Sequence, residues 1–131
     1  MTNPERSGFE TPTPLDDYKA LIDALVAIRP DVCARWLREK RPWPDMPQNR
    51  AVNDFLGKLS DAEREVVAQL LQHARDGGIN DVLAYLGDEM NLKGLRLVRK
   101  ARALPVEPFG TEIYYDWTSR REGDPWPEMG G

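Results

Sequence analysis

The chain has 131 residues, of which 40% are hydrophobic and 31% are charged. These proportions are typical of a globular domain and exclude a wholly disordered chain. The formal net charge is −4, from 22 acidic and 18 basic residues. A uniformly basic binder of nucleic acid or of membrane surfaces is therefore excluded as the default.

Targeting signals and disulfides are not predicted. The longest apolar-looking run, residues 20–28, contains Asp23 and is far shorter than the roughly 18 residues that span a bilayer. The N-terminal residues do not have the apolar segment of a secretory signal. Cys33 is the single cysteine, so no intramolecular disulfide can form. We expect a cytoplasmic, bacterial-type protein that makes no membrane contact.

The first two helices are predicted by their caps and apolar spacing. Residues 1–13, rich in proline and small polar residues, predict a flexible arm. Thr13 is expected to cap a helix that begins at Pro14 and ends before Pro30. Asp31 is expected to cap a shorter helix that Pro42 ends. The inward stripe of the first helix is Leu15, Tyr18, Leu21, Ile22, Leu25 and Ile28.

Three more helices are expected after an extended loop at residues 42–47. The third, residues 48–58, would bury Val52, Phe55, Leu56 and Leu59. Ser60 and Glu63 form a capping box that opens the fourth. Gly77-Gly78 is expected to end that helix, because glycine adopts the left-handed cap conformation without a steric penalty. A fifth would then begin at residue 79 or 80. The inward positions of these last two helices are Val66, Val67, Leu70, Leu71, Ala74, Val82, Leu83, Leu86 and Met90.

Strands are predicted after Gly94, where the apolar period changes. Residues 95–99 and 104–106 would pair as edge strands, and residues 111–119 alternate like a strand, with Ile113, Tyr115 and Trp117 on one face. The expected fold class is α+β, with about five helices followed by a small antiparallel sheet of two or three strands packed on them. We predict an arm at 1–13, one domain at 14–122 and an irregular tail at 123–131.

Four segments carry a resemblance to a known family: residues 45–49, 76–79, 105–112 and 124–128. The stretches from Asp45 to Asn91 and from Leu95 to Glu128 resemble a family of small bacterial proteins of unknown function. The resemblance implies no activity, cofactor or site residue.

No catalytic, metal or cofactor site is predicted. Glycine-rich phosphate loops and nucleophile elbows are missing from the sequence. His73, the one histidine, is expected on a helix flank, and His73 with Asp76 supplies too few ligands for a metal. Cys33 is expected to be an apolar filler, or a reactive thiol if cations surround it. The acids Asp81, Asp88 and Glu89 leave open a carboxylate-dependent enzyme if they line a pocket.

A short near-repeat is the most specific motif. Residues 42–46 are Pro-Trp-Pro-Asp-Met and residues 125–129 are Pro-Trp-Pro-Glu-Met. The prolines hold each tryptophan in extended backbone. Trp43 and Trp126 are therefore either exposed anchors for a partner or lids that tuck into the domain.

A compact basic segment is the second motif. Residues 93–102 contain five Lys or Arg and no acid, so the rest of the chain carries −9. The segment could grip phosphate or an acidic partner, or it could pair with the chain's own acids, such as Glu112 and Asp116.

These motifs favour a non-enzymatic protein-interaction or regulatory module of inhibitor or immunity type. The expected apolar anchors are Trp43, Met46 and Trp126, and the expected charge contacts are Arg96, Arg99, Lys100 and Arg102. A nucleic-acid binder that uses residues 93–102 with Tyr114 or Tyr115 is the alternative. The oligomeric state stays open, because periodicity does not separate a core face from a dimer seam.

Overall fold

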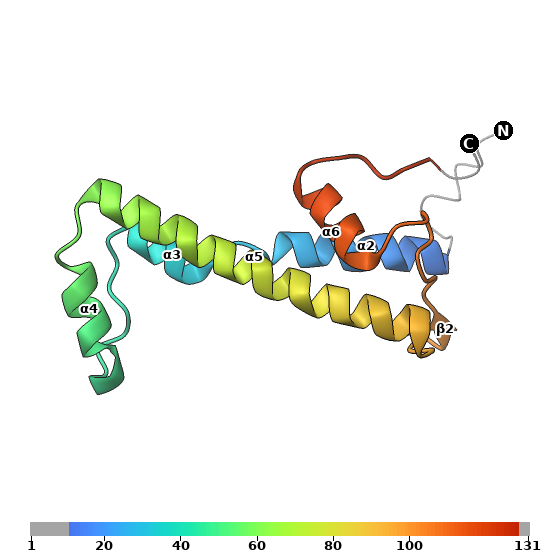
Figure 1. The fold of residues 1–131 in the computed structure, drawn as a ribbon, viewed down its shortest axis with the longest axis horizontal. Helices are drawn as coiled ribbons and strands as arrows, with labels where there is room; N and C mark the ends of the chain where they lie inside the picture. Colours follow the sequence, from blue (N-terminus) through green and yellow to red (C-terminus); the bar gives the residue numbers. More distant parts are fainter. Residues whose placement is uncertain (1–10, 129–131) are drawn as a thin grey trace. The chain divides into compact units, whose positions relative to one another are not determined.

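The computed structural model describes residues 11–128, and these residues form two compact units. The terminal unit combines both ends of the chain, Met1–Val26 and Val82–Gly131. The central unit is Ala27–Asp81. Figure 1 shows that one long helix, α5 (Asp61–Leu92), contributes its first part to the central unit and its last part to the terminal unit.

The terminal unit is built from α2 (Pro14–Ala27), the end of α5, a two-stranded hairpin and α6 (Ile113–Arg121). The strands β1 (Val98–Arg99) and β2 (Arg102–Ala103) pair antiparallel. Trp117 is fully buried at 0% exposure, and Gly87 lies close to Ile113. Burial of this apolar surface is what ties the sequence-distant ends of the chain together. The buried hydrophobic residues here are Tyr18, Ile22, Leu83, Met90, Leu104, Ile113 and Trp117.

The central unit contains α3 (Val32–Arg38), the 3₁₀ turn η1 (Pro47–Asn49), α4 (Arg50–Leu56) and the first part of α5. Its core is small. Ala34, Leu37, Leu56 and Ala68 are buried, and Trp43, Leu59, Val67 and Leu71 pack against them half-buried.

Three of the predicted helix caps are confirmed, whereas the third predicted helix begins at Arg50, after the 3₁₀ turn, and not at residue 48. The Thr13 hydroxyl accepts from the Asp16 amide at 3.1 Å, and the Asp31 carboxylate accepts from the Ala34 amide at 2.8 Å. The Ser60–Glu63 capping box is present in both directions, at 2.8 and 3.1 Å. Each cap satisfies amides that have no partner within the helix.

The predicted helix break at Gly77-Gly78 is wrong, because α5 continues through both glycines. The expected cap needs a positive φ, and the positive-φ glycines among the described residues are Gly94, Gly110 and Gly123. Gly94, at φ 77°, follows α5, and the Leu95 amide donates back to the Glu89 carbonyl at 3.1 Å. Four α-helices therefore precede the hairpin within residues 11–128, in place of the expected five.

The strand predicted over residues 111–119 is wrong; residues 113–119 lie in α6. Ile113, Asp116 and Trp117 are buried, at spacings of three and four that place them on one helical face. Core packing therefore overrides the β-propensity of the aromatic and branched residues. Two short strands are present, and the Leu104 amide extends the hairpin by donating to the Leu97 carbonyl at 2.7 Å. A small two-stranded antiparallel sheet is thus confirmed, but its second strand is Arg102–Ala103 and not the predicted residues 104–106.

Several residues predicted to face inward are exposed. They include Ile28 on the turn after α2, Val52 and Phe55 on α4, and Val66, Leu70 and Val82 on α5. Each helix of this small fold buries a narrower stripe than its apolar pattern suggests. Residues 1–10 of the predicted arm and 129–131 of the predicted tail lie outside the described residues, and the predicted domain bounds stay a prediction.

Candidate functional site

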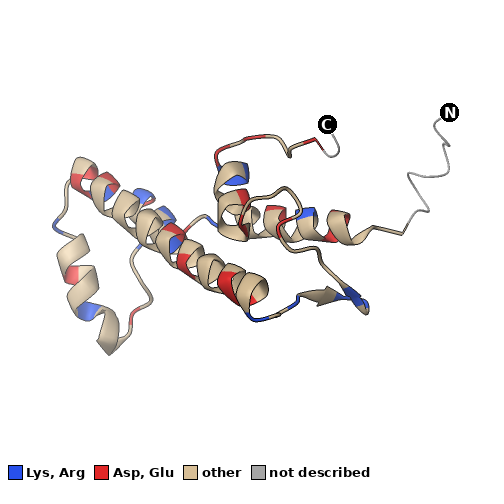
Figure 2. Ribbon diagram, turned by 45° about the vertical axis from the view of Figure 1, so that its right-hand side comes forward, with Lys and Arg blue, Asp and Glu red and all other residues tan. Residues whose placement is uncertain are grey.

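The basic segment forms the hairpin β1–β2. Arg99 pairs with Arg102 across the hairpin, so Lys100 and Ala101 form a two-residue turn. Both turn residues have positive φ, 49° and 65°, which a type I′ hairpin turn requires. Figure 2 shows the cations gathered along this segment.

Three of the four predicted charge contacts are engaged within the chain. The Arg99 and Arg102 guanidinium groups lie 3.7 and 3.8 Å from the carboxylate oxygens of Asp17, a buried residue of α2. Arg96 donates to the carbonyls of Met90 and Leu95, at 2.8 and 2.7 Å. Pairing with the chain's own acids therefore occurs, and the acid is Asp17.

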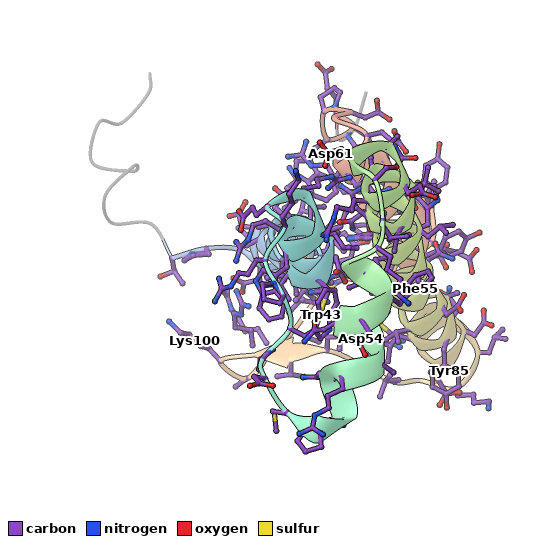
Figure 3. The ribbon with its side chains drawn as sticks, turned by 90° about the vertical axis from the view of Figure 1, so that its left-hand side faces the viewer. Trp43, Asp54, Phe55, Asp61, Tyr85 and Lys100 are labelled. Carbon is purple, nitrogen blue, oxygen red and sulfur yellow. The ribbon has the colours of Figure 1, made fainter. Side chains whose placement is uncertain are left out.

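Exposed apolar side chains lie in the hairpin and in the residues just before it, together with a lysine at the turn. Lys100 extends outward from the turn (Figure 3). Leu92, Leu95 and Val98 are exposed, Leu92 at 78% and Val98 at 62%. Exposed apolar groups beside a positive charge are a feature of interaction surfaces. We call Leu92, Leu95, Val98 and Lys100 the hairpin surface.

Trp43 packs inward as a lid on the central unit. Its ring meets the Trp36 ring edge-on, with centroids 5.7 Å apart. The Asn53 side chain clamps its backbone, accepting from the Trp43 amide at 2.9 Å and donating to the Trp43 carbonyl at 3.2 Å. The half-buried ring leaves Met46 as the exposed predicted anchor of this loop. Trp43 and the neighbouring α4 can be followed in Figure 3.

Trp126 packs onto the terminal unit in a different setting. It stacks on Phe109, with centroids 5.4 Å apart, and lies 6.3 Å from Tyr18. The Arg120 guanidinium is 4.7 Å from its ring centre, and its indole N–H donates to Asp23 at 3.3 Å. Arg120 is itself held by Asp23 at 2.9 and 3.2 Å. Phe109 and Asp23 are partners that the sequence analysis did not single out.

A cavity of about 230 Å³ lies in the terminal unit beside Trp126. Asp116 of α6 lines it and is 4% exposed. The Tyr18 hydroxyl donates to one Asp116 oxygen, and the Thr111 hydroxyl donates to the other at 2.5 Å. Thr111 also lines the cavity, and so do Phe109, Tyr115, Ser119, Arg120, Pro125, Trp126 and Pro127.

Burial, then the hydrogen bond to Asp116, raises the pKa of Tyr18 far above its usual range. Tyr18 therefore stays protonated and keeps donating to the carboxylate. The strand predicted over residues 111–119 puts Asp116 on the face opposite Ile113 and Trp117, so this buried carboxylate was missed. Its spacing from Ile113, three residues, was the available signal.

A second hollow, of about 280 Å³, lies in the central unit. Two ion pairs border it, Arg38 with Glu65 at 2.8 Å and Lys40 with Asp61 at 3.0 Å. Arg64 also lines this hollow, and its guanidinium donates to the Leu37 and Leu56 carbonyls at 3.3 and 2.8 Å.

The remaining candidate groups are dispersed. His73 is exposed, and Asp76 is bound to Arg29 at 2.7 Å. Within the described residues, no group of three or more His, Cys, Asp or Glu side chains is arranged to hold a metal ion.

Cys33 is half-buried, and burial followed by the charge of Asp31 raises the pKa of its thiol, which opposes thiolate formation. Among the acids that left an enzyme open, Asp81 and Asp88 are exposed and Glu89 pairs with Lys93 at 3.0 Å. Neither hollow described above is lined by them.

Sequence comparison places the chain in a family. Residues 11–128 match a family of unknown function (DUF6547), and the chain belongs to that family. The expected membership of a family of unknown function is confirmed. Comparisons with curated proteins and with solved structures gave no match. Between residues 11 and 128, no helix has the length and apolarity that crossing a membrane requires.

Proposed function

We propose that the protein is a non-enzymatic interaction module and that it binds an acidic protein through the hairpin surface. The supporting observation is the composition of residues 93–102, five cations without an acid, next to the exposed Leu92, Leu95 and Val98. The charge favours encounter with an acidic surface, and the apolar side chains supply burial on contact.

The turn favours binding because its shape is fixed before contact. Arg99 and Arg102 hold the hairpin to Asp17, and paired strands set the position of Lys100. A preformed surface loses little conformational entropy on association. In this proposal, Lys100 contacts the partner directly. The three arginines Arg96, Arg99 and Arg102 position the hairpin and add positive electrostatic potential.

The test is capture from a lysate of the source cells with three immobilised chains, with and without nuclease. They are the wild type, a hairpin variant carrying Val98→Asp and Lys100→Glu, and a control carrying Val66→Asp and Lys58→Glu. The control makes the same change in charge and in exposed apolar surface elsewhere. We expect one acidic protein, retained stoichiometrically by the wild type and the control after nuclease and lost by the hairpin variant.

Equal retention of that protein by both variants would contradict the proposal. Retention that disappears with nuclease would replace it with the nucleic-acid alternative, which a steep salt dependence of RNA binding would then establish.

A further inference from the structure

We propose that the cavity beside Trp126 binds a small organic ammonium ion, with the Asp116 carboxylate as its counter-ion. This site is separate from the hairpin surface, and it does not depend on the function proposed above. The argument combines the burial of Asp116, the charges around it, the aromatic wall and the size of the cavity.

Asp116 is a buried acid without a cation. Among the described residues it forms no ion pair, and its hydrogen-bond partners are the Tyr18 and Thr111 hydroxyls. A carboxylate has about four acceptor positions, so about two stay open after these bonds. Burying a charge is costly unless it is paired and hydrogen-bonded. An ammonium ion that enters the cavity would offset that cost with charge-assisted hydrogen bonds.

The neighbouring charges leave the cavity attractive to a cation. Arg120 is the one basic residue that lines it, and its guanidinium is held by Asp23 and by the Asp124 carbonyl at 2.9 Å. The Asp124 carboxylate accepts from the Ser119 hydroxyl at 2.8 Å. Asp23, Asp116 and Asp124 thus set three negative charges against two positive ones, Arg120 and the nearby Lys19, which leaves one negative charge in excess around the cavity. The local field therefore favours a cation and opposes an anion.

The aromatic wall favours the same ligand class. Phe109, Tyr115 and Trp126 line the cavity, and aromatic faces attract ammonium groups. Phe109 and Arg120 already contact the Trp126 ring, so the exposed Tyr115 ring is the main aromatic contact for a ligand. The chain provides an internal example, since the Lys19 ammonium lies 5.8 Å from the Phe109 ring centre and 6.0 Å from the Trp126 ring centre. Lys19 does not line the cavity.

The size of the cavity limits the ligand. A volume of about 230 Å³ is below the roughly 300–1,000 Å³ of pockets for drug-sized ligands. A short alkylammonium ion is small enough for this cavity, whether it is a free amine or the end of a lysine side chain. A nucleotide exceeds it.

The experiment is an NMR titration that follows the Trp126 indole N–H, assigned with a Trp126→Phe variant. The probes are n-butylammonium, neutral n-butanol and Nα-acetyl-lysine methylamide. We expect n-butylammonium to shift the Trp126 resonance and to bind at least tenfold more tightly than n-butanol. Binding of the lysine derivative as well would identify a polypeptide lysine as an acceptable source, and its exclusion would identify a free amine.

Three variants locate the site. Asp116→Asn keeps the size of the side chain and removes its charge, so n-butylammonium should bind at least tenfold more weakly. Tyr115→Ala truncates an exposed residue of the wall, at 55% exposure, and should weaken binding several-fold without unfolding the unit. Tyr85→Ala is the matched control, because Tyr85 is also an exposed tyrosine of the terminal unit and does not line the cavity (Figure 3).

Equal affinity for n-butylammonium and n-butanol would overturn the proposal, as would unchanged binding in Tyr115→Ala. If Asp116→Asn fails to fold by circular dichroism, the two neutral comparisons, n-butanol and Tyr115→Ala, decide the matter.

Discussion

The two Pro-Trp-Pro segments, residues 42–44 and 125–127, hold their tryptophans by different interactions. Trp43 meets the Trp36 ring and the buried core of the central unit, and one amide side chain, Asn53, clamps its backbone. Trp126 meets Phe109 and is surrounded by charged groups, with Arg120 over its ring and Asp23 on its indole N–H.

This difference shows what the shared motif determines. The prolines limit the backbone and remove amide donors in both segments. The partners come from elsewhere in each unit, so one tryptophan completes an apolar core and the other closes an electrostatic cluster beside a cavity. The same five-residue pattern therefore predicts different responses to truncation, pH and salt.

The largest contrast is expected from truncation. Trp43→Ala should lower the free energy of unfolding by about 2 kcal/mol, roughly half the cost for a fully buried tryptophan, because the ring is half-buried on the core. Trp126→Ala should cost about 1 kcal/mol, because part of its contact is with the partly exposed charged groups Arg120 and Asp23 and not with a buried core. Urea unfolding of both variants measures the two values. Equal or reversed costs would show that the two settings are energetically alike.

The next largest effect is expected at alkaline pH, where the terminal unit should unfold before the central unit. The four tyrosines all lie outside residues 27–81, and Tyr18 is 2% exposed. Its pKa is raised above the ordinary 10.0, so its contribution to stability is complete below pH 10 and is lost as pH rises further. With 5-fluorotryptophan, the ¹⁹F signals of Trp117 and Trp126 should leave their folded positions at lower pH than those of Trp36 and Trp43.

The variant Tyr18→Phe provides the control for this alkaline transition. It lacks the ionisable hydroxyl, so its terminal unit should lose less stability between neutral and alkaline pH than the wild type does. If all four fluorine signals move together in the wild type, the titration does not distinguish the units.

The amide clamp on Trp43 gives a smaller, local effect. Asn53→Ala removes the two hydrogen bonds to the Trp43 backbone and should cost about 1 kcal/mol. Its ¹⁹F signature should be confined to Trp36 and Trp43. Asn91→Ala, at an exposed position of α5, is the matched control and should leave stability within about 0.5 kcal/mol of the wild type. A Trp126 signal that moves in Asn53→Ala would contradict the prediction that the effect of this clamp is local to Trp36 and Trp43.

Sequence reasoning worked where the determinants were local. The Ser60–Glu63 capping box lies within four residues, and Asp31 caps a helix three residues on, so both follow from short-range chemistry. It failed at Gly77-Gly78, where a local glycine signal competes with the rest of α5. Gln72 and Arg75 bind the Arg29 carbonyl at 3.1 and 2.9 Å just before the glycines, which supports the helix there.

The α6 segment shows the limit of periodicity. Ile113, Tyr115 and Trp117 alternate as in a strand, yet Ile113 and Trp117 are also four residues apart, as on one helical face. The pattern alone does not choose between the two, and the core does. The candidate cavity was beyond reach for a related reason, since Trp126 and Asp23 are separated by 103 positions and Tyr18 and Asp116 by 98.

Salt should produce the smallest effect and the most direct test of the charged setting of Trp126. Arg120 and Asp23 are partly exposed, so screening should weaken their pair, which is worth at most about 1 kcal/mol. Raising NaCl from about 0.05 to 1 M should shift the ¹⁹F signal of Trp126 and leave that of Trp43 in place. Asp23→Asn should reproduce the shift at low salt and abolish its salt dependence, whereas Asp54→Asn, an exposed position on α4, should do neither. A salt response of equal size at Trp43 would mean that charge does not set the two segments apart, and that the ring contacts with Phe109 and Tyr18 hold Trp126 in place.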